Sequence, residues 1–342
     1  MHPSLFAAVL LTVPAIAFPM TRPKTLADCA GIADNRQRLA CFDRLAAEES
    51  RPPVQPAAPD ASFSENPPAT SAPAAKSPAF SLSRHWELDP EDKHGTFAFR
   101  PHYDNYVLFA NYSTAPNRTP FSSLTGLSSE DTRLSHTELK FQLGFKMKLL
   151  ENLSARHADL WFGYTQQSYW QAYNSKASSP FRETNYQPEL MYVMPVDYHF
   201  LGMHGRFVNF GLVHQSNGRG AELSRSWNRL YIQTGLERGN FTLLARAWKR
   251  LNESAEDDDN PDILDYMGYG DLSATYRWRG HEFSVLARRN FRTDRGALQL
   301  GWAFPLAERI KGYVQLFSGY GQSLIDYNYD QKTLGLGILV SY

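Results

Sequence analysis

The stretch ELKFQLGFKMKLL, residues 138–150, decides the fold class, because apolar and polar side chains alternate along almost its whole length. Successive side chains of a β-strand point to opposite faces, so this alternation gives one apolar and one polar face. The apolar face carries Leu139, Phe141, Leu143, Phe145, Met147 and Leu149, and the other carries Glu138, Lys140, Gln142, Gly144, Lys146 and Lys148. A strand of a soluble sandwich would show the same pattern, so the choice depends on the rest of the chain.

Alternating segments recur through the chain and favour a transmembrane β-barrel. Most reach the roughly 9 to 11 residues that a tilted strand needs to cross a bilayer. An even number of strands is typical of bacterial barrels. We therefore predict an all-β fold over residues 82–342, a twelve-stranded antiparallel transmembrane β-barrel, with strands near 103–113, 137–150, 157–172, 186–196, 205–216, 226–237, 240–251, 266–278, 281–290, 296–304, 310–321 and 332–342.

Composition agrees with a barrel and excludes two other classes. The mean hydropathy is −0.45 and no internal run of 18 or more apolar residues exists, which argues against a helical membrane protein. Aromatic residues make up 13% of the chain, enough for the aromatic girdles of a barrel. The 35 basic and 35 acidic side chains balance, whereas a nucleic-acid partner normally requires a basic face.

Three segments precede the predicted barrel. The apolar run SLFAAVLLTVPAIA, residues 4–17, ends in an A-x-A pattern and predicts a secretory signal over 1–17, with a buried helix as the alternative. Residues 18–50 have helical apolar spacing and predict a small helical module in the periplasm, where Cys29 and Cys41 would form a disulfide rather than remain thiols. Residues 51–81 are rich in Pro, Ala and Ser, so we predict a disordered linker.

A second stretch, VNFGLVHQSNGRGAELSRSWNRLY at residues 208–231, carries the candidate catalytic residues. His214 and Ser216 are two residues apart and share a strand face with the apolar side chains before them. A hairpin that returns after the glycine-bearing loop could place Asn228 on that face. Such a trio could hydrolyse a lipid ester, with Ser216 as nucleophile, His214 as base and Asn228 orienting the imidazole. A Ser and a His on one strand face are, however, more often simple neighbours.

The string HQSNGR followed by SRSWNRLY resembles the active-site segment of the outer membrane phospholipase A family, the calcium-dependent acyl hydrolases of Gram-negative outer membranes. The family has a twelve-stranded barrel, and the final strand, which ends in Tyr342, is similar to the assembly signal of outer membrane barrels. The resemblance covers most of residues 100–342. Four more strings resemble the family in the expected order: YTQQSYWQ (164–171), SSPFRETNY (178–186), DDNPDILDYMGY (258–269) and SGYGQSLIDYN (318–328).

The resemblance also implies a calcium ion at the site. Its ligands would be the Arg219 carbonyl and the Ser224 hydroxyl of one subunit and Ser178 of the partner subunit, which are hard oxygen donors. From the residues themselves, Gly218 allows the loop backbone to approach the reacting ester closely, so its N–H is a candidate oxyanion donor.

Two further features concern the dimer and a second ion. Gln166 lies in an otherwise apolar row, and the resemblance places it at a homodimer interface, where two such glutamines bond across a two-fold axis. The family's second calcium position uses acidic residues. Asp259 matches one of them, but Ala221 stands where another is expected, which puts that position in doubt.

The predicted function is therefore a calcium-dependent outer membrane phospholipase, activated by dimerisation. It would hydrolyse the sn-1 and sn-2 acyl esters of glycerophospholipids and also lysophospholipids. Two alternatives remain open. The chain could be a non-catalytic channel or adhesin barrel, whose polar constellations should face the lumen, or a barrel esterase that acts on other lipids.

Overall fold

The computed structural model describes residues 26–49, 80–123, 125–129, 131–154 and 156–340. The chain divides into two compact units, residues 1–73 and 74–342. The predicted signal, most of the predicted linker and Tyr342 lie outside the described residues. None of the helices in the described part of the chain is long and apolar enough to cross a membrane.

The described residues of the first unit, 26–49, form two helices joined by a disulfide. Helix α1 spans Leu26–Ala30 and α2 spans Asn35–Glu49, and Cys29 is bonded to Cys41 as the sequence predicts. Asp34 precedes α2, and its Oδ1 accepts hydrogen bonds from two backbone N–H groups of the first turn, at 2.9 and 3.1 Å. This contact satisfies donors that a helix start otherwise leaves unpaired. In so small a unit, the disulfide offsets the limited apolar core.

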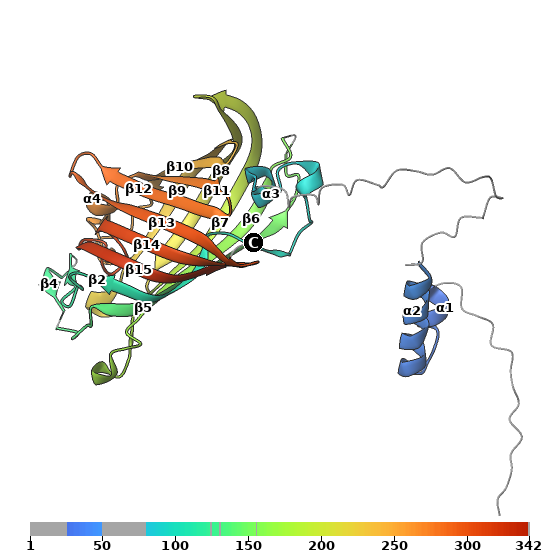
Figure 1. Cartoon of the computed structure of the whole chain (residues 1–342), viewed down its shortest axis with the longest axis horizontal. Helices are drawn as coiled ribbons and strands as arrows, with labels where there is room; N and C mark the ends of the chain where they lie inside the picture. Colours follow the sequence, from blue (N-terminus) through green and yellow to red (C-terminus); the bar gives the residue numbers. More distant parts are fainter. Residues whose placement is uncertain (1–25, 50–79, 124, 130, 155, 341–342) are drawn as a thin grey trace, which may run out of the picture. The chain divides into compact units, whose positions relative to one another are not determined.

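Twelve antiparallel strands of the second unit form a closed barrel (Figure 1), which confirms the predicted fold class. Each strand pairs with the next along the chain, and β2 pairs with both β5 and β15, so the ring closes without an edge. The strands are β2 (Asn105–Ser113), β5 (Thr137–Leu150), β6 (Asp159–Trp170), β7 (Phe181–Phe200), β8 (Met203–Ser216), β9 (Ser226–Arg238), β10 (Phe241–Arg250), β11 (Gly270–Trp278), β12 (His281–Asn290), β13 (Arg295–Ala307), β14 (Ile310–Tyr320) and β15 (Asp330–Val340).

Three shorter strands accompany the ring in the described part of the chain. Strand β1 (Phe99–Pro101) pairs with the part of β5 beyond β2. Strands β3 (Phe121–Ser122) and β4 (Leu127–Ser128) form a separate ribbon in the segment between β2 and β5.

Apolar side chains cover the outside of the barrel. Phe210 and Leu212 of β8 and Leu230 of β9 are 48%, 46% and 49% exposed, and similar rows follow the other strands. Trp278 and Trp302 lie on the same outer surface near one end of the barrel, as aromatic girdle residues do. So large an apolar surface is stable against hydrocarbon and not against water, which supports a membrane-spanning barrel.

Several charged side chains inside the barrel form ion pairs. The guanidinium of Arg182 donates to Glu138 at 2.9 and 3.0 Å and to Asp326 at 2.7 Å, with all three side chains buried. Lys148 bonds to Glu87 at 2.8 Å. Pairing of this kind removes most of the cost of burying charge, and it ties distant strands and loops together across the lumen.

Helix α3 (Leu82–Trp86) packs into the end of the barrel where the strands are joined by tight turns. Ser81 caps it by accepting a hydrogen bond from the N–H of Arg84, at 3.2 Å. The Trp86 ring is buried 5.3 Å from that of Phe207, and the Lys146 ammonium lies 3.5 Å from its centre. An aromatic face stabilises such a desolvated cation, so α3 and the barrel wall support one another.

The two ends of the barrel differ in the length of their connections. Tight turns at 201–202, 239–240, 279–280 and 308–309 lie at the α3 end, and the long connections, such as 217–225 and 251–269, lie at the other. Figure 1 shows α3 and α4 at opposite ends. Outer membrane barrels place short turns in the periplasm and long loops outside.

The starts of two strands, β11 and β7, were predicted wrongly. Tyr266 and Met267 belong to helix α4 (Ile263–Met267), and β11 begins only at Gly270. Ile263 and Met267, four residues apart, are buried in one apolar cluster with Leu324 and Tyr327. This tertiary packing favours one helical turn over a strand. Strand β7 also begins earlier than predicted, at Phe181.

Candidate active site

The β8–β9 pairing brings His214 and Asn228 together on the outer face. The two residues are direct partners in the ladder, and His214 Nδ1 lies 2.9 Å from Asn228 Oδ1. Ser216 follows two residues later on the same face. In the described part of the chain its hydroxyl makes no hydrogen bond to His214. Such bonds are often long before substrate binds. The predicted trio thus shares one surface, with the His–Asn contact already formed.

The opposite faces of β8 and β9 are packed inside the barrel. Trp227 is fully buried, and its Nε1–H donates to Gln215 Oε1 at 2.8 Å. The Arg229 guanidinium stacks on the Trp227 ring at 3.9 Å and also donates to Gln215, at 3.2 Å. This cluster holds the two strands in register and leaves the trio on the outer face of the barrel.

The loop after Ser216 is held by Asn217 and Arg225. The Asn217 Oδ1 accepts from the Arg225 N–H at 3.0 Å, and its Nδ2 donates to the Leu223 carbonyl at 2.8 Å. Arg225 is 1% exposed, and its guanidinium donates to the carbonyl of Phe121 at 2.8 Å. The loop is therefore a built structure, although the sequence analysis singled out neither anchor.

Gly218 has a backbone conformation that favours glycine. Its φ is +62°, and a Cβ built there would lie 3.2 Å from Tyr186 Cε2. The neighbouring Arg219 N–H already donates to Asn217 Oδ1, at 3.3 Å. The Arg219 N–H is thus already engaged within the loop, and the Gly218 N–H stays the candidate oxyanion donor that the sequence suggests.

The residues assigned to calcium lie in the loops at the same end. Ser224 Oγ donates to Asp259 Oδ2 at 2.5 Å, so residues 35 positions apart meet. Ser178 ends the short helix η2 (Ser175–Ala177) between β6 and β7. Among the described residues, no group of three or more His, Cys, Asp or Glu could hold a metal. A hydroxyl beside a carboxylate nevertheless suits a hard cation that takes its other ligands from carbonyls and water.

Gln166 lies on the outer face of β6. Its Oε1 accepts from the Tyr164 hydroxyl at 3.3 Å, and its Nε2 donates to Ser168 Oγ at 3.2 Å. Ser168 also accepts from Thr184 of β7, at 3.2 Å. A polar patch therefore interrupts the apolar surface at the predicted dimer position.

The segment 251–262 carries residues that the sequence analysis missed. Glu253 Oε1 accepts from Asn228 Nδ2 at 2.9 Å. Asn260 is fully buried, and its Oδ1 accepts from the Ser226 N–H at 2.9 Å. Neither side chain belongs to a periodic pattern, and Glu253 lies 25 residues beyond Asn228, so only the folded loop reveals the contact.

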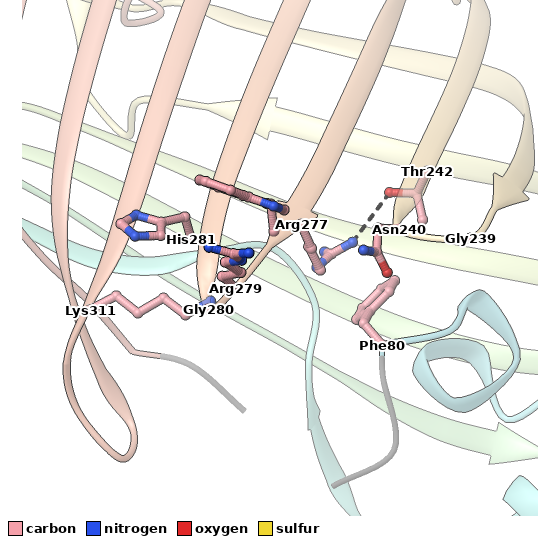
Figure 2. A pocket seen from close by; sticks show the side chains of 10 residues that line it. Phe80, Gly239, Asn240, Thr242, Arg277, Arg279, Gly280, His281 and Lys311 are labelled. Atoms are coloured by element: carbon pink, nitrogen blue, oxygen red, sulfur yellow. Dashed lines mark hydrogen bonds between the residues drawn. The ribbon is translucent and has the colours of Figure 1, made fainter. Parts of the chain in front are cut away.

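A pocket of about 230 Å³ lies at the tight-turn end, away from the trio. Figure 2 shows Arg277, Arg279 and Lys311 around it, with Arg277 directed to Thr242 at 3.5 Å. It contains none of the predicted site residues, so we assign it no part in the chemistry of the trio.

Comparison with known proteins identifies relatives of the chain. The sequence model of the phospholipase A1 family matches residues 82–340. Phospholipase A1 of Escherichia coli (strain K12) is 38% identical over 72% of this chain and 82% of its own length. A relative from Neisseria meningitidis serogroup B is 38% identical over 92% of this chain and 91% of its own length, so it also covers part of the N-terminal unit.

Solved structures are similar over the barrel. The outer membrane phospholipase A of Escherichia coli has a TM-score of 0.68 and 35% identity, and the match covers 76% of this chain and 99% of that one. The calcium-bound dimer of the Salmonella typhi outer membrane phospholipase has a TM-score of 0.67 and 35% identity, with 75% and 96% coverage.

We expect Gly218→Ala to lower the free energy of unfolding by about 1 to 2 kcal/mol, because a side chain is strained in this left-handed conformation. Gly220→Ala is the matched control, since that residue lacks a positive φ and a Cβ there meets nothing within 4 Å. Denaturant titration of the refolded protein would measure both. Equal effects of the two substitutions would contradict the assignment.

Proposed function

The chain belongs to the phospholipase A1 family of outer membrane enzymes, which hydrolyse phospholipids, and we propose that it does so with a Ser216–His214–Asn228 triad, calcium and a dimer. The observation that carries the proposal is the 2.9 Å contact between His214 and Asn228, on the lipid-facing surface that also bears Ser216. We further propose that sn-1 and sn-2 acyl esters and lysophospholipids are substrates. The barrel would stand in the outer membrane with residues 18–50 in the periplasm.

The reaction follows from the protonation of the triad. The amide oxygen of Asn228 can only accept, so the proton of a neutral His214 resides on Nδ1 and Nε2 is free to act as base. His214 takes the proton of Ser216 as its oxygen attacks the ester carbonyl, and returns it to the leaving alcohol. Water then cleaves the acyl-enzyme by the same proton transfers. The Gly218 N–H would bind the oxyanion of both tetrahedral intermediates.

Calcium fits the loop residues beside the triad. The Arg219 carbonyl and the Ser224 hydroxyl would hold it, together with Ser178 of the partner subunit, and a bound calcium would polarise the ester carbonyl. The 2.5 Å bond from Ser224 to Asp259 supports this assignment, because a carboxylate behind a ligand orients it and adds negative charge near the ion. Asp259 also matches one acid of the family's second calcium position, but Ala221 supplies no carboxylate there, so we do not propose that second position.

Dimerisation would join two outer faces at Gln166. The bonds to Tyr164 and Ser168 use one N–H group and one oxygen lone pair of the amide, so the side chain can still donate and accept once more. A second glutamine across a two-fold axis offers the complementary pair. In hydrocarbon no water competes for these hydrogen bonds, so the glutamine pair would fix the orientation of one subunit relative to the other.

We expect Ser216→Ala to abolish calcium-dependent release of fatty acid from phospholipid micelles, because the substitution removes the hydroxyl that attacks the ester carbonyl. A chelator should abolish fatty-acid release by the parent protein, and the control variant Ser273→Ala, on the remote β11, should remain active. Release by a folded Ser216→Ala variant, or by the parent in chelator, would refute the mechanism.

Asp259→Asn should raise the calcium concentration for half-maximal activity by about 10- to 100-fold, the usual effect of losing a residue that supports a metal ligand. Asp257→Asn removes a charge from the exposed part of the same loop and serves as control. A calcium titration of activity measures both. An unchanged midpoint in Asp259→Asn would exclude Asp259 from the calcium site.

We expect Gln166→Ala to weaken the calcium-dependent dimer severalfold, because an interfacial hydrogen-bond pair is lost. Gln187→Ala, on the inner face of the adjacent β7, should leave the dimer unchanged. Sedimentation equilibrium in detergent reports the dissociation constant. The interface lies elsewhere if the two variants dimerise equally well.

A further inference from the structure

A carboxylate stands behind Asn228. Glu253 Oε1 accepts from Asn228 Nδ2 at 2.9 Å, while Asn228 Oδ1 faces His214 Nδ1 at the same distance. The amide therefore links a carboxylate to the imidazole. We propose that Glu253 is a positioning residue that orients Asn228 and, through its amide, supplies the negative charge that an asparagine lacks. This inference rests on the proposed triad.

Glu253 determines which way the Asn228 amide points. An ionised carboxylate only accepts hydrogen bonds, so the NH₂ group of Asn228 must face Glu253. The amide oxygen then faces His214, and the reversed amide would set two oxygens against each other. This orientation places the imidazole proton on Nδ1 and leaves Nε2 to accept the proton of Ser216.

The backbone after β10 holds Glu253 in place. Beyond the last ladder pair, Arg250 with Arg229, the Leu251 N–H donates to the Asn228 carbonyl at 2.8 Å. The chain thus runs beside Asn228 for one more residue before the loop departs. Glu253 reaches the amide from this continuation.

The charge of Glu253 is only partly matched by a cation. The Arg250 guanidinium lies 3.6 Å from Glu253 Oε2 but only 2.5 Å from Asp258 Oδ1. Among the described residues, Glu253 Oε2 is buried with no hydrogen-bond partner. Burial raises the pKa of Glu253, with Asp258 and Asp259 adding to this, while Arg250 and the Asn228 bond oppose it. A partly desolvated carboxylate acts strongly on the amide beside it.

The test compares Glu253→Gln with Glu256→Gln, an exposed carboxylate of the same loop. Glu253→Gln should reduce kcat by about tenfold, the loss expected of one charge-assisted hydrogen bond, with KM little changed. A negative charge raises the pKa of an imidazolium, so its removal should also move the acid limb of the kcat/KM profile to lower pH. Glu256→Gln should change neither. A Glu253→Gln profile like that of Glu256→Gln would overturn the proposal.

A double-mutant cycle separates this role from simple support of the loop. In an Asn228→Ala background, Glu253→Gln should have no further effect on kcat, because the link to His214 is already cut. Asn228→Asp combined with Glu253→Gln should restore kcat and the acid limb, since the charge then sits directly on His214. A tenfold loss in the Asn228→Ala background, or no restoration in the double variant, would overturn the proposal.

Failure of the triad would look different. If folded Ser216→Ala still releases fatty acid, the triad and the role of Glu253 both fall. If Ser216→Ala is inactive while Glu253→Gln keeps the parent kcat and pH profile, the triad stands and Glu253 is only part of the loop.

Discussion

The register of β8 against β9 is the constraint on which the site depends. A strand alternates its side chains strictly, so a slip of one residue would turn His214 or Asn228 into the lumen and separate the pair. Packing on the inner face opposes such a slip. Trp227, Arg229 and Gln215 contact one another there. A one-residue slip would break these contacts and bring side chains of different size or polarity into the cluster. Packing inside the lumen thus fixes the arrangement of the proposed catalytic residues on the opposite side of the barrel wall.

The same coupling extends to the loops. Glu183 is buried inside the barrel and lies 3.3 Å from the Arg219 guanidinium and 3.4 Å from Asn217 Nδ2. Both partners belong to the loop that follows Ser216. Arg225 donates from that loop to the Phe121 carbonyl of β3, and Asn260, in the segment after β10, accepts from the Ser226 N–H at the start of β9. Polar contacts in the lumen and loops therefore fix where the strands and loops lie, whereas the outer apolar side chains mainly make the barrel wall compatible with hydrocarbon.

Sequence patterns reached those features that depend on local geometry. Alternation predicts the strands, because a two-residue period is written into each segment, and it places His214 and Ser216 on one face. It fails at Tyr266 and Met267, where packing of loops on one another favours a helical turn. The alternation also does not reveal the roles of three loop residues, Asn217, Glu253 and Asn260. Each works through a single contact between distant loop residues, and no periodic property marks such a contact. The proposed calcium ligands and the proposed dimer role of Gln166 came only from the family resemblance.

The outward position of the proposed triad changes what substrate concentration means for this enzyme. Ser216 and His214 open onto the apolar belt of β8 and not onto a water-filled cavity, so a phospholipid would approach by lateral diffusion within the leaflet. Products would leave into the same layer. The encounter rate would then follow the mole fraction of phospholipid in the surface rather than moles per litre. Dilution of that surface with inert detergent would slow turnover even at constant bulk lipid, and the composition of the leaflet becomes a control on activity.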